Sequence, residues 1–72
     1  MRVTAQSIFK RAHNLTTAEQ ARDLAIDWQH WQSERSMSYA ESALWIDLFE
    51  QLGERFGLTE EFRENGIIGD PP

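Results

Sequence analysis

Hydrophobic residues recur at steps of three and four along two long stretches of the chain, which is the spacing of one face of an α-helix. In the first stretch these positions are Ala21, Leu24, Trp28 and Trp31. In the second stretch they form one broad face made of Leu44, Trp45, Leu48, Phe49, Leu52 and Phe56. Strand-like alternation of apolar and polar residues is missing, so the pattern predicts an all-α protein.

Two capping boxes predict where the long helices begin. In such a box a Ser or Thr hydroxyl and a Glu carboxylate three residues later each satisfy a backbone N–H at the helix start. Thr16 and Glu19 form the first box, and the helix it opens is predicted to run to about Glu34. Ser38 and Glu41 form the second box. Its helix is predicted to stop at Gly57, with Gly53 marking either close packing or early fraying.

Shorter helices are predicted at both ends. Thr4 is expected to cap the first one, with Asn14 as its stop. Thr59 is expected to cap the last one, which ends at Asn65–Gly66. The short connection between the long helices predicts an antiparallel helical hairpin. Residues 1–68 are interpreted as a single all-helical domain, and residues 69–72 as a disordered tail.

The size of the chain favours self-association. A 72-residue domain buries only about 60% of the surface that its unfolded chain exposes. The sequence contains no cysteine, so a disulfide cannot add stability. Absence of cysteine, of a secretory leader and of a long apolar run leads us to expect a cytoplasmic protein without a membrane role.

Three tryptophans on the two long helices predict a protein interface. Trp28 and Trp31 point about 60° apart around their helix, so one monomer is not expected to enclose both. The predicted interface residues are Leu24, Trp28, Trp31, Tyr39, Trp45, Ile46 and Phe49. We expect a homodimeric helical bundle. The alternatives are that these aromatic residues form only a monomer core, or that they bind a different protein.

Candidate chemistry is sparse. Asp27, His30 and Glu34 share a helix face at a spacing that contributes to di-metal sites in bundles, so a metal-binding bundle is an alternative interpretation. A single copy is half of such a site, and a solvated polar face is the simpler interpretation. The serines lie at caps and connections, and no cofactor motif occurs. We therefore expect a non-enzymatic protein without metal or cofactor.

The charge distribution argues against direct binding of nucleic acid. The net charge is −5, with +3 on residues 1–18 and −8 on the remainder. A helix-turn-helix outline is conceivable, but both long helices carry acids where contacts to phosphates need bases. The same acids permit the opposite idea, an acidic DNA mimic that inhibits a nucleic-acid-binding protein.

Two segments are the most distinctive parts of the sequence: Ala25-Ile26-Asp27-Trp28-Gln29-His30-Trp31 and Leu44-Trp45-Ile46-Asp47-Leu48-Phe49-Glu50. With its length, its capped helices and this acidic, tryptophan-bearing hairpin, the protein resembles short accessory proteins of temperate bacteriophages, including those of lambdoid early regions. The resemblance implies a non-enzymatic modulator that acts by binding a host protein. It transfers no functional residue to this sequence.

Overall fold

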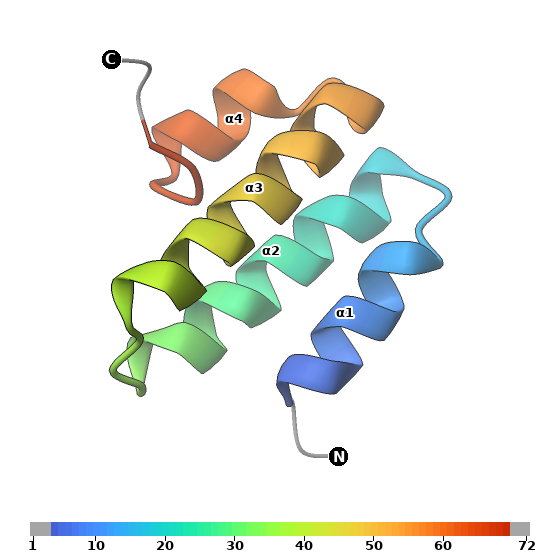
Figure 1. The fold of residues 1–72 in the computed structure, drawn as a ribbon. Helices are drawn as coiled ribbons and strands as arrows, with labels where there is room; N and C mark the ends of the chain where they lie inside the picture. Colours follow the sequence, from blue (N-terminus) through green and yellow to red (C-terminus); the bar gives the residue numbers. More distant parts are fainter. Residues whose placement is uncertain (1–3, 70–72) are drawn as a thin grey trace. The chain divides into compact units, whose positions relative to one another are not determined.

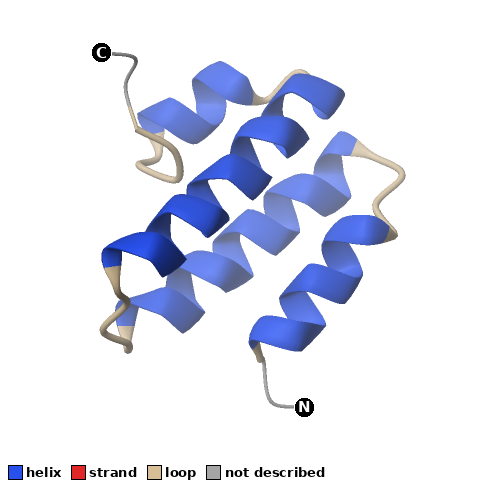
Figure 2. Ribbon diagram, in the orientation of Figure 1, coloured by secondary structure: helices blue, strands red, loops and turns tan. Residues whose placement is uncertain are grey.

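The computed structural model describes residues 4–69, and within this range all regular structure is helical (Figures 1 and 2). The helices are α1 (Ala5–His13), α2 (Ala18–Ser33), α3 (Tyr39–Phe56) and α4 (Thr59–Glu64). The prediction of an all-α protein is confirmed. The protein divides into two compact units, Met1–Ser36 and Met37–Pro72. The predicted disordered tail falls largely on residues 70–72, which lie outside the described residues.

In the first unit, α1 and α2 run side by side in opposite directions (Figure 1). Thr4 caps α1 as predicted: its hydroxyl accepts from the Ser7 backbone N–H at 3.1 Å, and the Ser7 hydroxyl accepts from Thr4 N–H at 3.0 Å. Asn14 ends the helix, also as predicted, and its side-chain amide donates to the Lys10 carbonyl. Ile8 is buried on the inward face of α1.

The start of α2 corrects the predicted capping box by one residue. Thr17, not Thr16, is the N-cap, and its hydroxyl accepts from Gln20 N–H at 3.2 Å. The Gln20 side chain accepts in turn from the backbone N–H of Thr16 at 2.8 Å. A glutamine therefore takes the reciprocal role that the sequence assigned to Glu19, and its amide oxygen reaches one residue further out than in a capping box.

In the second unit, α3 begins and ends where the sequence predicts. The Ser38 hydroxyl accepts from Glu41 N–H at 3.2 Å, and Gly57 terminates the helix in the left-handed region at φ 70°. The buried residues of α3 are Trp45, Phe49, Leu52 and Gly53. The expectation that Leu44 packs on this face is wrong, because its side chain is 65% exposed. The buried stripe is narrower than the apolar pattern suggested.

Gly53 allows α4 to cross close to α3. Its carbonyl accepts the backbone N–H groups of both Gly57 and Leu58, which close the end of α3. A Cβ atom at Gly53 would lie 3.0 Å from Thr59 Oγ1 and 3.1 Å from Thr59 Cα, which is tighter than ordinary van der Waals contact. Of the two roles predicted for Gly53, close packing is therefore the correct one.

The last helix starts one residue earlier than predicted. Leu58, rather than Thr59, is the N-cap of α4. Its backbone carbonyl accepts from the Phe62 N–H at 2.8 Å, and no side chain caps this helix start. The reason is the left-handed Gly57, which turns the backbone so sharply that Leu58 already begins the next helix. Phe62 packs edge-on against Phe49, with ring centroids 5.9 Å apart.

A Schellman motif ends α4. Gly66 has φ 72° and donates its N–H to the Arg63 carbonyl at 3.1 Å, while Ile67 N–H donates to the Phe62 carbonyl at 2.8 Å. Ile67 and Ile68 are both buried. The motif thus turns the backbone so that two apolar residues beyond the helix complete the packing of this unit.

The corrected N-cap of α2 leads to the first prediction. Thr17→Ala removes an acceptor for a backbone N–H at the helix start and should lower the free energy of unfolding by about 1 kcal/mol. Thr16→Ala is the matched control and should cost less, because its hydroxyl contacts only the exposed Gln20 side chain. Urea denaturation of both variants measures the difference. A larger effect at Thr16 would contradict the observed start of α2.

The close crossing at Gly53 leads to the second prediction. Gly53→Ala improves helix propensity by about 1 kcal/mol, yet overpacking against the Thr59 backbone costs about 1–3 kcal/mol. We expect a net loss of about 1 kcal/mol in thermal or urea unfolding. Ala43→Gly, at an exposed position of the same helix, calibrates the propensity term. Stabilisation by Gly53→Ala would show that the two helices separate freely.

Candidate functional site

An ion pair joins the two helices of the first unit. Arg11 Nη1 on α1 lies 2.6 Å from Asp27 Oδ2 on α2, and both residues remain partly exposed. Asp27 is one of three residues considered for a metal site, and the guanidinium takes up one of its oxygens. The other two residues, His30 and Glu34, are both exposed, and Glu34 lies just beyond the last helical residue of α2. Within residues 4–69, no group of three or more potential ligands is arranged to hold a metal ion.

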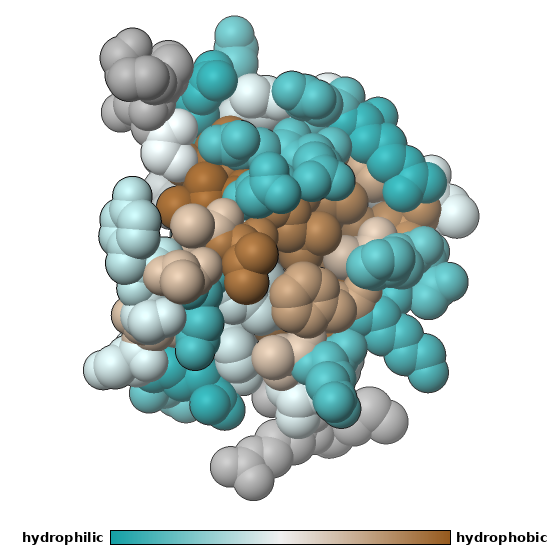
Figure 3. Space-filling view, viewed as in Figure 1, coloured by the Kyte–Doolittle hydropathy of each residue, from teal (hydrophilic) through white to brown (hydrophobic). Residues whose placement is uncertain are grey.

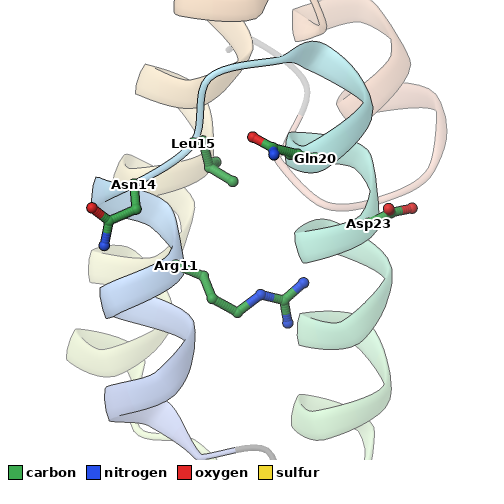
Figure 4. Close-up of a pocket in the computed structure, with 5 residues that line it drawn as sticks. All are labelled: Arg11, Asn14, Leu15, Gln20 and Asp23. Atoms are coloured by element: carbon green, nitrogen blue, oxygen red, sulfur yellow. The ribbon is translucent and has the colours of Figure 1, made fainter.

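A shallow depression of about 220 Å³ lies where α1 ends and α2 begins. Its lining residues are Arg11, Asn14, Leu15, Gln20 and Asp23 (Figure 4). The Arg11 side chain extends towards α2 (Figure 4). The side chain of Leu15, in the connection between α1 and α2, faces that of Gln20 on α2 (Figure 4). The amide groups of Asn14 and Gln20 bond the neighbouring backbone, at Lys10 and Thr16. These polar groups stabilise the helix ends, and their arrangement supplies neither a nucleophile nor an acid-base pair.

The His13 imidazole also serves a helix end. Its Nδ1 lies 2.8 Å from the Phe9 carbonyl, one turn earlier on α1. Because a carbonyl oxygen only accepts hydrogen bonds, Nδ1 carries the proton in this contact. His13 is exposed, and this contact holds its ring against the last turn of α1.

The predicted interface residues have three different environments. Leu24, Trp28, Trp45 and Phe49 are buried. Trp31 and Ile46 are half-buried, and the guanidinium of Arg35 covers the Trp31 ring at 4.7 Å from its centroid. Tyr39 is 92% exposed. Only Tyr39 of the seven is therefore fully open to a partner, while the assignment of the set as an interface stays a prediction.

Large apolar residues in water occur in both units. They are Phe9 on α1, Ile26 on α2, and Tyr39 and Leu44 on α3. Apolar groups are visible among the hydrophilic ones on the face drawn in Figure 3. Ala40 and Ala43 are exposed as well, and together with Tyr39 and Leu44 they occupy one side of the first turns of α3. We call these four residues the α3 apolar surface.

Sequence reasoning found one residue of the α3 apolar surface and missed three. Leu44 was assigned to the buried face because it fits a three-and-four spacing with Leu48 and Leu52. The two alanines carry little hydrophobic signal and were not considered. A sequence signal did exist, since Ala40, Ala43 and Leu44 share a helix side with Tyr39, away from Trp45 and Phe49.

Charge is divided unequally between the units. Residues 1–36 contain five basic and four acidic residues, whereas residues 37–72 contain two basic and eight acidic residues. On α3, Asp47, Glu50 and Glu54 are exposed at positions that follow one another along one side of the helix. The acidic character of the protein thus belongs to the second unit.

Comparisons with known proteins give no match. Neither a family model, nor a curated protein, nor a solved structure matches this sequence. In the part of the protein that the structure describes, no helix combines the length and apolar character needed to cross a membrane.

The Arg11–Asp27 ion pair leads to the third prediction. Partly exposed ion pairs are worth about 0.2–1 kcal/mol, so a double-mutant cycle with Arg11→Ala and Asp27→Ala should give a coupling energy in this range. The coupling should decrease in high salt. Arg11→Ala combined with Glu34→Ala, two helical turns further along, is the control and should be additive. If the Arg11/Asp27 and Arg11/Glu34 cycles gave the same coupling energy, a specific ion pair between Arg11 and Asp27 would be excluded.

Proposed function

We propose that this protein is a small, non-enzymatic protein-protein interaction module that self-associates, with the α3 apolar surface as part of the contact. The observation that carries the proposal is the exposure of Tyr39 at 92% and Leu44 at 65% on one short stretch of helix. Isolated exposed apolar residues are common on soluble domains, but several on one side of a helix, an aromatic ring among them, are typical of interfaces.

The energetics of burial favour this surface as a contact. Removing a leucine or an aromatic residue from water contributes on the order of 1.5–3 kcal/mol. Tyrosine is well suited to such sites because its ring supplies contact area while its hydroxyl stays hydrated at the edge. Ala40 and Ala43 lie between the two larger residues and are small enough for a second helix to approach closely.

The proposed assembly is a dimeric helical bundle built from two helical hairpins. Five residues, 34–38, connect α2 to α3, and connections this short favour antiparallel neighbours. In this proposal α2 and α3 are the arms of each hairpin. Trp31 and Ile46, which are half-buried, extend the contact beyond the α3 apolar surface. Association adds the buried surface that a 72-residue domain lacks.

A host protein is the alternative partner, in keeping with the resemblance to temperate-phage accessory proteins. The exposed row of Asp47, Glu50 and Glu54 favours one particular form of this alternative, an acidic DNA mimic. A mimic would compete with DNA for its target, and the competition would weaken with salt. Binding through the α3 apolar surface would change little with salt, because hydrophobic contacts are not screened.

Sedimentation equilibrium tests self-association and provides the fourth prediction. The wild-type protein should dimerise at micromolar concentration, and the double variant Tyr39→Ala/Leu44→Ala should weaken the dimer by at least about 2 kcal/mol, or roughly 30-fold in Kd. Ile26→Ala changes an exposed apolar residue of the first unit and is the matched control, expected to leave Kd unchanged. Circular dichroism verifies that all variants remain helical.

Three results would lead elsewhere. A wild-type monomer at high micromolar concentration would reject self-association and leave the host partner as the proposal to pursue. If Trp31→Ala weakens the dimer and Tyr39→Ala/Leu44→Ala does not, the contact lies around Trp31 and not on the α3 apolar surface. Salt-sensitive competition with DNA for a captured partner would identify the mimic.

A further inference from the structure

The last helix ends in a chemically reactive dipeptide. Asn65 is exposed, and the residue after it is Gly66. The amide group of an asparagine is attacked most readily by the following backbone nitrogen when that residue is glycine, because no Cβ hinders the approach. We propose that Asn65 is a site of spontaneous deamidation, and that the Schellman motif at the end of α4 controls when the reaction occurs.

The reaction needs only water and a solvent base. The base removes the proton of the Gly66 backbone N–H, and this nitrogen attacks Cγ of Asn65. A bond forms between the Gly66 nitrogen and Cγ, the bond between Cγ and the amide Nδ2 breaks, and ammonia leaves with one proton. Water then adds to one of the two carbonyl carbons of the five-membered succinimide, the bond from that carbon to the Gly66 nitrogen breaks, and the nitrogen regains a proton. The product is either aspartate or isoaspartate at position 65, so the net change is amide plus water to carboxylic acid plus ammonia.

The backbone geometry at Asn65 opposes ring closure. The ring contains Cα, Cβ and Cγ of Asn65, its carbonyl carbon and the Gly66 nitrogen, so that nitrogen must lie on the same side as Cβ. Asn65 has ψ 4°, which places the Gly66 nitrogen alongside the backbone nitrogen of Asn65 instead. Ring closure therefore requires about a third of a turn of rotation about the bond from Cα to the carbonyl carbon, because substituents at a tetrahedral carbon are spaced by that angle.

This rotation cannot occur while the Schellman motif is intact. The Gly66 N–H that must lose its proton is donated to the Arg63 carbonyl at 3.1 Å. The next two N–H groups, of Ile67 and Ile68, are both directed to the Phe62 carbonyl, at 2.8 and 3.3 Å. Both isoleucines are buried. Deamidation thus requires a local opening in which the end of α4 unwinds and two apolar residues enter water.

The two products affect the motif differently. Aspartate places a negative charge at the C-terminal end of a helix, where the helix dipole disfavours it. Isoaspartate routes the backbone through Cβ and Cγ and so adds one methylene between α4 and Gly66. With that insertion, the N–H groups of Gly66 and Ile67 no longer match the Arg63 and Phe62 carbonyls in register. Conversion to isoaspartate therefore makes a transient opening of this corner permanent, whereas conversion to aspartate only weakens the end of the helix.

Peptide mapping by mass spectrometry tests the proposal and provides the fifth prediction. The protein is incubated at mildly alkaline pH in native buffer and in urea, and the conversion of Asn65 is followed as a gain of about one mass unit, the difference between an amide and an acid. Conversion in native buffer should be slower than in urea by on the order of tenfold or more. Asn14, which precedes Leu15, is an internal control and should not convert on this timescale.

A variant that loosens the corner without changing the dipeptide separates gating from intrinsic chemistry. Ile67→Ala should raise the native rate several-fold towards the urea rate and leave the urea rate unchanged. If circular dichroism shows that Ile67→Ala is unfolded, the milder Ile68→Val replaces it. The Ile67 amide should also be protected from hydrogen exchange by about the same factor that slows deamidation, since one opening controls both.

Several outcomes would overturn the proposal. Failure of Asn65 to convert in urea would remove the site. Equal deamidation rates in native buffer and in urea would show that the Schellman motif does not control the reaction. A folded Ile67→Ala or Ile68→Val variant that deamidates no faster than the wild type would show the same. If the hydrogen-exchange protection factor of the Ile67 amide differs by orders of magnitude from the factor by which folding slows deamidation, the two processes do not share one opening.

Discussion

The backbone groups at helix ends must be satisfied, and much of this structure depends on how that is done. The helices of residues 4–69 are short relative to their ends, so many of their N–H and carbonyl groups have no partner inside their own helix. Hydroxyl groups of Thr4, Thr17 and Ser38 accept at three of the helix starts. Gly57 and Gly66 close the ends of α3 and α4. Each cap also decides where the backbone turns, and hence which residues the next segment brings inward.

The corner between α3 and α4 shows how one constraint leads to the next. The Gly53 carbonyl closes the end of α3, and the absence of a Cβ at this position allows Thr59 to come near. This close crossing lets the Phe62 ring pack nearly perpendicular to the Phe49 ring. The Schellman motif then returns Ile67 and Ile68 to the interior. A dipeptide suited to that motif is also the most easily deamidated one, so the element that completes the unit is also the site of the proposed deamidation.

Polar contacts in the first unit and exposed apolar and acidic residues on α3 are the main surface features of the molecule. In the first unit, the amide groups of Asn14 and Gln20 bond the backbone at helix ends, and Arg11 pairs with Asp27. On α3, apolar and acidic residues occupy different stretches: Tyr39 and Leu44 lie near its start, and Asp47, Glu50 and Glu54 follow. An apolar area next to an acidic one can provide affinity and selectivity at once, because burial drives association while charge disfavours acidic partners.

Periodicity and capping residues are local signals, and they were enough to predict the helical class and most of the helix boundaries. They identified the starts at Thr4 and Ser38 and the ends at Asn14, Glu34 and Gly57. Local signals failed where two neighbouring threonines could both serve, at the start of α2, and where a sharp turn replaced a hydroxyl cap, at Leu58. Which apolar residues are enclosed depends on packing in the folded protein: Leu44 and Trp45 both fit the periodicity of α3, yet Leu44 is exposed and Trp45 is buried. The difference arises because burial depends on the width of the surface that packs against a helix, and spacing along one helix carries no information about that width. The same holds for Gly53, whose close contact with Thr59 exists only once α4 has folded back.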